Sequence, residues 1–361
     1  MTTLESSSGG PFYDITPHIE KTPIKTFGPR KPTICILGGA GYIGRNLVYY
    51  LTRNTDYNII VADYFSRPSK AISTEVRKRF TDLIKGYPVT VLDIDLINEW
   101  DGHYGEEVNI VINLAGVMPR RRIDTLNLTA HDGDDSSILT KNTMLTNNSV
   151  NRLNDSPNIR SYIFASSMSV ELTPDSNYGQ SKRISEDMFD AASRRSYGNN
   201  NCWSNRIIRL PNVIGRGFDR NCRPIAKTDI LFNLGKAYKT NTTFYCPDFN
   251  TRRTYVDVRD IATMFGDVAI EILTGVNSGT PVMRAEWEYS FSETNHGIFM
   301  MLENNGIDAN VHMAEMKDIP DTPPPSRTQT VSQWHKVTTK HKTRDTFIEF
   351  FDILDDIDFD L

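Results

Sequence analysis

The sequence lacks the features that mark membrane, secreted or metal-binding proteins. No apolar run approaches the roughly 20 residues of a membrane-spanning helix, and the polar residues 1–30 lack the apolar segment of a signal peptide. The 4 cysteines show no metal-ligand spacing, and nothing in the chain demands an oxidising compartment. We therefore expect a cytoplasmic protein with no metal site and no membrane span, and a flexible arm over residues 1–30.

The charge balance argues against one class of partner. A net charge of -5 disfavours a general nucleic-acid-binding protein, which would carry a strongly basic surface. What the chain does have is length and apolar content. Its 361 residues are 39% hydrophobic, which is enough for one large domain and a smaller one.

Short apolar runs alternate with helical patterns from residue 33 onward. The Val108–Leu114 run is apolar enough for a parallel strand that is covered on both faces. Helices are expected from the glycine-rich turn through Leu51 and over residues 70–85. The expected strands are 33–37, 58–62, 89–92, 108–114, 159–165 and 206–210. This succession predicts an α/β fold, a Rossmann-type doubly wound parallel sheet with right-handed crossovers.

The alternation loosens after about residue 212. We expect the Rossmann domain over residues 31–211 and a smaller C-terminal α/β substrate lobe over 212–361, partly interleaved with it. A proline-rich loop is predicted at 320–325, and residues 352–361 suit either a capping helix or an acidic tail. In the lobe, strands are expected near 243–246 and 253–257, and helices near 226–239, 258–274 and 291–304.

A glycine-rich run joins the first strand to the first helix. Glycines in this context let the backbone approach a dinucleotide pyrophosphate, which sits at the amino terminus of the helix. The run reads Gly38-Gly39-Ala40-Gly41-Tyr42-Ile43-Gly44. From it we expect cofactor contacts at Gly38, Gly41, Tyr42, Ile43 and Gly44.

Two aspartates end the next two strands. Asp63 closes the second strand, where a carboxylate can accept hydrogen bonds from both ribose hydroxyls. It would repel a 2′-phosphate, so NAD is favoured over NADP as cofactor. Asp93, followed by Ile94, ends the third strand and could accept a hydrogen bond from the adenine amino group.

Tyr178 and Lys182 lie four residues, or one helical turn, apart, so their side chains share a helix face. Tyrosine has a reference pKa of about 10, so a base poised near 7 needs roughly 4 kcal/mol of differential stabilisation. We expect the Lys182 ammonium and the positive charge of an oxidised nicotinamide to supply this stabilisation. The pair therefore indicates proton transfer in a nicotinamide-dependent reaction.

Several motifs over residues 33–275 jointly resemble a known family, the extended short-chain dehydrogenase/reductases, in their nucleotide-sugar epimerase and dehydratase group. Asn142 also matches a structural helix asparagine of that family. The motifs are Gly38 to Gly44, Asn113-Leu114-Ala115-Gly116, Ser166-Ser167, Tyr178 to Lys182, Arg209 to Gly215 and Arg253 to Asp260.

The resemblance implies roles for individual residues. Ser167 would donate a hydrogen bond to the reacting sugar oxygen, with Ser166 as the alternative, while Tyr178 transfers the proton and Lys182 holds the nicotinamide ribose and lowers the tyrosine pKa. For the cofactor, the resemblance implies contacts at Leu114, Ala115 and Gly116. For the nucleotide diphosphate it implies Asn212 and Arg253, with Arg252 as the alternative donor and an ion pair of Arg253 with Asp248 or Asp257 as the competing interpretation.

Absent residues narrow the choice within the family. Dehydratases carry acidic residues where this chain has Met168 and Ser169, and a thioether and a hydroxyl cannot perform that elimination. We therefore expect an NAD-dependent nucleotide-sugar epimerase that acts at C4 through a 4-keto sugar. As a separate expectation, the protein forms a homodimer. The chain departs from the family at Glu171-Leu172 and in the short spacing between Ser167 and Tyr178.

Two other functions stay open. A dehydrogenase or reductase of another hydroxyl or keto substrate is favoured by the short Ser167–Tyr178 spacing, and a non-catalytic NAD-binding regulator is the second alternative. In the insertion between Gly116 and Asn142, the arginines 120–122 suit either a substrate phosphate or a solvated cluster. The acidic run 131–135 resembles a calcium loop only loosely.

Overall fold

The computed structural model describes most of the chain outside its first thirty residues. The predicted arm over 1–30 and the proline-rich segment 320–325 lie outside the described residues, as do Arg120, Arg121 and most of the acidic run. The described residues are 31–65, 70–100, 104–119, 122–124, 129–131, 136–151, 153, 156–198, 203–225, 230–246, 252–275, 284–287, 291–308, 311–313, 334–337 and 340–357.

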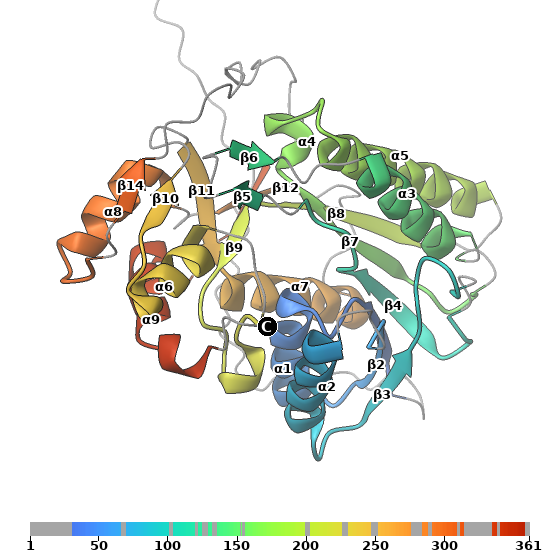
Figure 1. Ribbon diagram of the computed structural model, residues 1–361. Helices are drawn as coiled ribbons and strands as arrows, with labels where there is room; N and C mark the ends of the chain where they lie inside the picture. The colour runs from blue at the N-terminus through green and yellow to red at the C-terminus, as the bar shows by residue number, and fades with distance from the viewer. Residues whose placement is uncertain are drawn as a thin grey trace, which may run out of the picture.

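A six-stranded parallel sheet forms the larger part of the molecule, as Figure 1 shows. Its order is β3-β2-β1-β4-β7-β8, so the chain starts in the middle and winds outward in both directions. The strands are β1 (Thr33–Leu37), β2 (Asn58–Asp63), β3 (Val89–Asp93), β4 (Val108–Asn113), β7 (Ser161–Ser167) and β8 (Ser204–Leu210). This arrangement confirms the predicted doubly wound α/β fold.

Helices cover both faces of the sheet. The helices α1 (Tyr42–Asn54), α2 (Lys70–Ile84) and α7 (Val258–Thr274) lie on one face. The helices α3 (Ser136–Val150) and α5 (Asn177–Gly198) lie on the other (Figure 1). Each face has its own apolar core, the first around Ile34 and Ile36 and the second around Cys35 and Leu37, because successive strand residues point to opposite faces.

Helix α7 lies beyond residue 212 in sequence but belongs to the packing of the sheet. A Cβ on Gly266 would lie 2.4 Å from the Tyr50 ring, so α7 and α1 meet at a contact that only glycine permits. The side chains Ile261, Phe265 and Val268 complete the first core. The chain therefore returns to the sheet after it has begun the second unit.

The second unit combines short strands with three helices at the other side of the molecule in Figure 1. The strands β9 (Asn212–Ile214), β11 (Arg252–Asp257) and β13 (Phe291–Thr294) form one sheet, and β10 (Phe244–Cys246) pairs with β14 (Val311–Met313). The helices are α6 (Ile230–Thr240), α8 (Asn295–Glu303) and α9 (Thr343–Phe351). Their shared core contains Leu234, Phe347 and Phe350.

The helix predicted over 291–304 was wrong at its beginning. Residues 291–294 form β13, which pairs antiparallel with β11, and the helix starts only at Asn295. A cross-strand ladder thus overrides local helical periodicity. At the end of the described chain, the 3-10 turn η3 (Leu354–Asp356) follows α9, and the buried Leu354 and Ile357 pack on the second core.

The remaining elements are short. The helix α4 (Ser169–Leu172) joins β7 to α5, and the 3-10 turn η2 (Arg220–Cys222) follows β9. The smallest strand pairs are β5 (Arg122–Asp124) with β6 (Thr129–His131), and β12 (Arg284–Trp287) with β15 (Trp334–Val337). Within the described residues, no helix is both long and apolar enough to cross a membrane.

Candidate active site

The glycine-rich turn between β1 and α1 is possible only with glycine at two of its positions. Gly38 has φ of +76°, and a Cβ there would lie 2.8 Å from the Ala115 backbone. A Cβ on Gly44 would lie 2.6 Å from the Gly38 carbonyl oxygen. The absence of side chains at these positions therefore allows β1, α1 and the end of β4 to pack closely. It also leaves the backbone of the turn accessible to a ligand.

The amino terminus of α1 suits a pyrophosphate. Gly41 is its N-cap residue and has no side chain with which to cap the helix. The first-turn amides at Tyr42, Ile43 and Gly44 precede the first intrahelical bond, in which the Arg45 N–H donates to the Gly41 carbonyl at 2.9 Å. Backbone donors and the positive end of the helix dipole therefore gather where the sequence predicts the phosphates.

Asp63 stands directly beside the glycine turn. Its carboxylate is buried, with Oδ2 accepting the Ala40 N–H at 2.9 Å and Oδ1 accepting the Tyr64 N–H at 2.8 Å. Sequence reasoning assigned Asp63 to the cofactor ribose but missed this second role of supporting the turn. A carboxylate oxygen has more than one lone pair, so the two roles are compatible.

Asp93 lies opposite Asp63 in the β2–β3 register, and its carboxylate already has two partners. Oδ1 accepts the Phe65 N–H at 2.9 Å, and Oδ2 forms a 2.7 Å ion pair with Arg77. The Ile94 N–H donates to the Asp63 carbonyl at 3.0 Å. Asp63, Asp93 and Ile94 therefore lie together at one edge of the predicted adenosine site.

The end of β4 meets the glycine turn from the other side. The Leu114 N–H donates to the Leu37 carbonyl at 2.9 Å, and the Ala115 N–H donates to the Asn113 side-chain oxygen at 3.0 Å. A Cβ on Gly116 would lie 3.4 Å from the Lys182 ammonium. Residues 114–116 thus connect the turn to the predicted catalytic lysine.

The structure separates Ser166 from Ser167. Ser166 is buried and donates to the Glu186 carboxylate at 2.5 Å. Ser167, the next residue of β7, interacts with Tyr178 and donates to the Ser169 hydroxyl at 3.1 Å. Because neighbouring strand residues point in opposite directions, Ser167 is the serine that faces the predicted base.

Tyr178 and Lys182 lie side by side in the first two turns of α5. The Lys182 ammonium is 5.9 Å from the centre of the Tyr178 ring and donates to the Ala165 carbonyl at 2.9 Å. Burial raises the pKa of Tyr178 to about 12, against the opposing effect of the Ser167 hydrogen bond. Burial lowers the pKa of Lys182 to about 8, and Glu186 opposes this shift.

The short segment between Ser167 and Tyr178 is filled by α4 and a tight turn. A Cβ on Gly179 would lie 2.3 Å from the Thr173 carbonyl oxygen and 2.8 Å from that of Ser169. This contact sets the start of α5 against α4, directly beside Tyr178. Gly179 belongs to the motif Tyr178 to Lys182, but its steric role follows only from the packing of α4 against α5.

The predicted substrate residues lie on adjacent strands of the second unit. Asn212 on β9 donates through its side-chain amide to the Thr254 carbonyl at 3.1 Å, and Arg253 on β11 is exposed. The described residues show no ion pair between Arg253 and Asp257, whose carboxylate is fully buried and binds Arg259 at 2.7 Å. Asp248 and the side chain of Arg252 lie outside the described residues.

Polar residues of α1 that sequence reasoning missed bind the segment after β9. The buried Arg45 guanidinium donates to the carbonyls of Asn221, Ala40 and Arg223 at 2.6–2.8 Å. The fully buried Asn46 donates to the Cys222 carbonyl at 3.1 Å. Two polar residues on the core side of an amphipathic helix were the available signal. They link the glycine turn to the chain that continues from Asn212.

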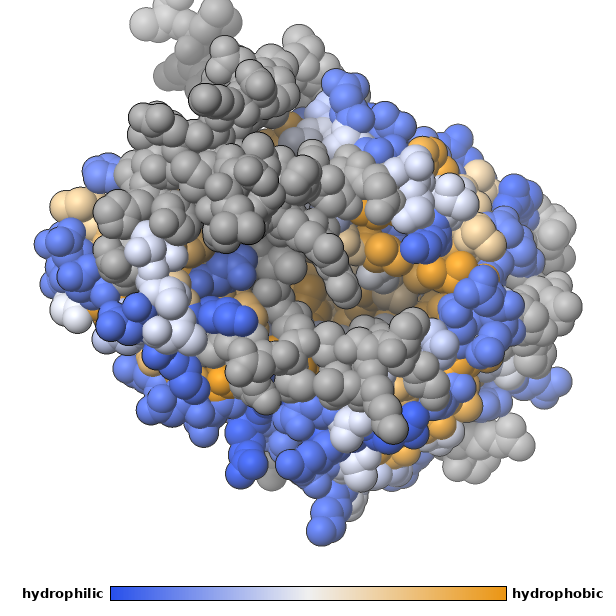
Figure 2. All heavy atoms as spheres, in the orientation of Figure 1, coloured by the Kyte–Doolittle hydropathy of each residue, from blue (hydrophilic) through white to orange (hydrophobic). Residues whose placement is uncertain are grey.

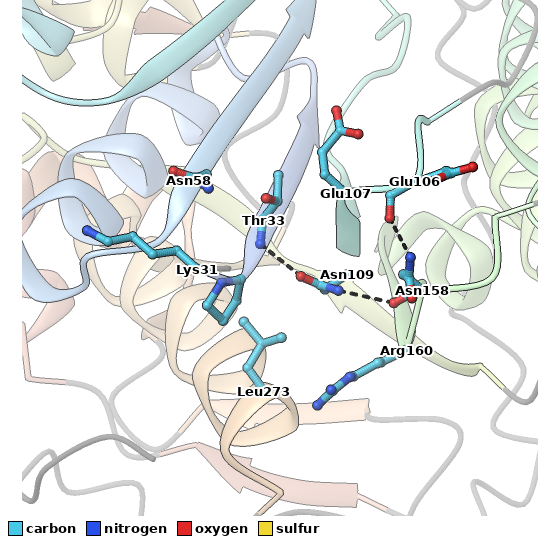
Figure 3. A pocket seen from close by; sticks show the side chains of 10 residues that line it. Lys31, Thr33, Asn58, Glu106, Glu107, Asn109, Asn158, Arg160 and Leu273 are labelled. Atoms are coloured by element: carbon cyan, nitrogen blue, oxygen red, sulfur yellow. Dashed lines mark hydrogen bonds between the residues drawn. The ribbon is translucent and has the colours of Figure 1, made fainter. Parts of the chain in front are cut away.

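A cavity of about 450 Å³ lies at the opposite, amino-terminal end of the sheet. Its charged side chains, among them Lys31, Glu107 and Arg160, point away from one another in Figure 3. Its amide side chain Asn109 accepts the Thr33 N–H at 3.0 Å and is thus engaged by the backbone. Ligands of doubly wound sheets bind at the carboxyl ends of the strands, so this cavity is not the candidate active site.

Surface hydropathy in Figure 2 shows apolar atoms on the floor of a recess near the middle of the face. Binding sites for small molecules are concave and mostly apolar, with a few well-placed polar groups. In this protein the polar groups of the candidate active site are the backbone of the glycine turn, the Asp63 carboxylate, and the side chains of Ser167, Tyr178 and Lys182. In the described part of the chain, no group of three or more His, Cys, Asp or Glu side chains is placed to hold a metal ion.

Solved structures with a similar fold include two UDP-sugar 4-epimerases. UDP-glucuronic acid 4-epimerase from Bacillus cereus, in complex with UDP-glucuronic acid and NAD, is 19% identical with a TM-score of 0.63, over 90% of this chain and 99% of that chain. UDP-glucose 4-epimerase from Bifidobacterium longum, in complex with NAD+ and UDP, is 17% identical with a TM-score of 0.59, over 88% of this chain and 97% of that chain. At these identities the likeness establishes the fold.

A further structure has the same fold at still lower identity. UDP-glucose 4-epimerase from Stenotrophomonas maltophila, with bound NAD, is 11% identical with a TM-score of 0.64, over 90% of this chain and 98% of that chain. No curated protein gives a significant match to the sequence.

Family membership follows from the sequence match. Residues 34–271, more than half of the chain, match the model of the NAD dependent epimerase/dehydratase family. This match covers the glycine turn, Ser167, Tyr178, Lys182, Asn212 and Arg253. It confirms the resemblance drawn from the motifs, and with it the expectation of NAD as cofactor. The chain therefore belongs to the NAD-dependent epimerase/dehydratase family.

Proposed function

We propose that this protein is an NAD-dependent nucleotide-sugar 4-epimerase. The observation that carries the proposal is the placement of Ser167, Tyr178 and Lys182 around one point, next to the glycine turn. In this arrangement a hydroxyl bound at Ser167 can pass its proton to Tyr178 beside the nicotinamide end of the cofactor. NAD, when bound, supplies the acceptor and donor of hydride.

Each residue of the triad has a separate task. Tyr178 takes the proton of the sugar 4-hydroxyl, and Ser167 donates a hydrogen bond to the same oxygen. The positive charge of Lys182 favours the phenolate, which counteracts the rise of the Tyr178 pKa to about 12 caused by burial. The 4-keto sugar then turns in the pocket, and Tyr178 returns the proton after hydride has been restored to the opposite face.

The contacts of Glu171 support an epimerase over a dehydratase. Water elimination next to a keto group needs an acid–base pair, and Met168 and Ser169 supply no carboxylate. Glu171 is the nearest acidic residue after the serines, and its carboxylate binds the guanidinium of Arg209. A carboxylate engaged in this ion pair is a poor candidate for moving a substrate proton.

A nucleotide sugar is the proposed substrate because related folds were solved with a nucleotide sugar or with the nucleotide UDP. The structures from Bacillus cereus and Bifidobacterium longum contain UDP-glucuronic acid and UDP. In this chain, the exposed guanidinium of Arg253 is the proposed phosphate ligand, and Asn212 lies on the neighbouring strand. The homodimer and the cytoplasmic location stay predictions.

The test is product analysis with labelled substrate. The purified protein with NAD would be incubated with a panel of UDP-sugars that carry deuterium at C4, and products would be resolved by NMR. We expect the C4 epimer to appear with its deuterium retained and without net NADH. Steady NADH accumulation would instead establish a dehydrogenase, the alternative favoured by the short spacing between Ser167 and Tyr178. No conversion of any nucleotide sugar would refute the epimerase proposal.

A further inference from the structure

A large apolar side chain lies exposed at the hydroxyl of the proposed base. Met118 has 63% of its surface exposed, and its sulfur lies 3.5 Å from the Tyr178 hydroxyl oxygen, from which it accepts a hydrogen bond. Tyr178 itself is only 8% exposed. Met118 therefore stands between Tyr178 and the side from which a substrate would approach.

The fold holds Met118 in this place through its neighbour Val117. The Val117 N–H donates to the Asn142 side-chain oxygen at 2.7 Å, and the Asn142 amide donates back to the Val117 carbonyl at 3.0 Å. The same amide donates to the Ser181 hydroxyl at 3.0 Å, which in turn donates to the Tyr178 carbonyl at 2.8 Å. One buried side chain, Asn142, thus fixes the Met118 backbone relative to Tyr178.

The chemistry of the thioether makes this contact replaceable. Methionine sulfur is a weak hydrogen-bond acceptor and is not basic enough to take the phenolic proton. A sugar hydroxyl forms a stronger bond with the phenol and displaces the sulfur. The remaining methionine chain is flexible and polarizable, so it can pack against differently shaped apolar surfaces.

We propose that Met118 is a specificity-determining residue that leaves the Tyr178 hydroxyl when substrate binds and packs against the C–H surface of the sugar ring. This inference rests on the proposed function. A ring that turns between two hydride-transfer orientations presents a different face in each, and a flexible apolar side chain can contact both. Met118 would therefore contact the sugar, whereas Arg253 and Asn212 would contact the nucleotide.

The test separates affinity for the sugar from affinity for the nucleotide. Calorimetric titration of the NAD-loaded protein with UDP and with a converted UDP-sugar would be made for Met118→Ala, Met118→Leu and the matched control Met300→Ala, an exposed methionine on α8. We expect Met118→Ala to weaken UDP-sugar binding by about 5- to 30-fold while UDP and NAD binding stay unchanged. The UDP-sugar affinity of Met118→Leu should stay within about 3-fold of that of the unmodified protein. The affinity of Met300→Ala should equal that of the unmodified protein.

Kinetics give a second reading of the same variants. Because Met118 does not move the proton, Met118→Ala should raise KM for the sugar more than it lowers kcat. An unchanged ratio of UDP to UDP-sugar affinity in Met118→Ala would overturn the inference. Equal losses of UDP, NAD and UDP-sugar binding would also overturn it, because they indicate a structural role. If the unmodified protein converts no UDP-sugar, the proposed function fails first and takes this inference with it.

Discussion

Arg209 donates two hydrogen bonds to Glu186 next to the candidate active site. The guanidinium Nε and Nη2 donate to the two carboxylate oxygens at 2.8 Å and 2.5 Å, and both side chains are buried. Ser166 donates to the same carboxylate, and Arg209 also binds Glu171 of α4. The pair therefore ties β7, β8 and α4 to α5, one helical turn beyond Lys182.

Replacing Glu186 with Gln should destabilise the protein strongly. The buried Arg209 guanidinium keeps its ion pair with Glu171 but loses one of two charged partners, which should cost about 1.5–3 kcal/mol of unfolding free energy. Chemical denaturation monitored by circular dichroism would measure the change, with Glu303→Gln on the exposed surface of α8 as the matched control. A loss below about 1 kcal/mol would show that Glu171 alone satisfies Arg209.

Tyr178→Phe should abolish most turnover without loss of the fold. The substitution removes one hydroxyl, so bound NAD and the melting temperature should change little, while turnover falls by about 10²–10⁴-fold. The exposed Tyr238, in α6, provides the control variant Tyr238→Phe, which should keep full activity. Near-normal turnover of Tyr178→Phe would mean that another group is the base.

Asp63→Asn should narrow the preference for NAD over NADP. The asparagine keeps an oxygen that can accept the Ala40 N–H, although its amide group then faces the Tyr64 N–H, and the charge that repels a 2′-phosphate is lost. We expect the ratio of the two dissociation constants to fall by about tenfold or more. Tighter binding of NADP than NAD by the unmodified protein would remove Asp63 from the cofactor site altogether.

Arg253→Ala should weaken binding of the nucleotide diphosphate and spare NAD. Loss of a charge-assisted bond to a phosphate costs about 1.5–3 kcal/mol, or roughly ten- to a hundredfold in affinity. Arg344→Ala, at an exposed position of α9, serves as the control for the loss of a surface charge. Equal dissociation constants for UDP before and after the change would show that Arg253 does not bind phosphate.

Asp267→Asn should change how stability depends on pH. Asp267 accepts the Tyr50 hydroxyl at 2.5 Å between α7 and α1, and burial raises its pKa from 3.8 to about 6. A carboxyl whose pKa is higher in the folded state binds its proton more tightly there. Its contribution to stability is therefore full below about pH 3.8 and is lost as the pH rises through about 6.

The asparagine variant does not titrate, so it removes this loss. Its unfolding free energy relative to the unmodified protein should rise by about 2–3 kcal/mol between pH 4 and pH 7. In the wild-type protein, Asp267 Oδ2 is buried and has no hydrogen-bond partner among the described residues, so an amide group there carries a free-energy cost that does not change with pH. This constant cost cancels when the change in stability between pH 4 and pH 7 is compared for the two proteins. Parallel stability curves for the two proteins would contradict the raised pKa.

Much of the larger unit could be predicted from local patterns. The six strands, the glycine turn and the positions of Asp63 and Tyr178 follow from strand length, glycine spacing and the placement of aspartates at strand ends. The β13 strand could not be predicted, because residues 291–294 become a strand only by pairing with β11. Arg45 and Asn46 gave a similar difficulty, since their partners lie about 175 residues away in the sequence.

The α/β class, the family and the residue types for proton transfer could be predicted from the amino-acid sequence, because these depend on periodicity and short motifs. Which of Ser166 and Ser167 faces Tyr178 became clear from the folded chain, since a strand alternates its sides and the register at its end is set by β8. The tertiary structure alone also brought Met118 to the base, through hydrogen bonds from Asn142 that no local pattern encodes. Side-chain direction and long-range contact are properties of packing, so they appear only once the elements have been assembled.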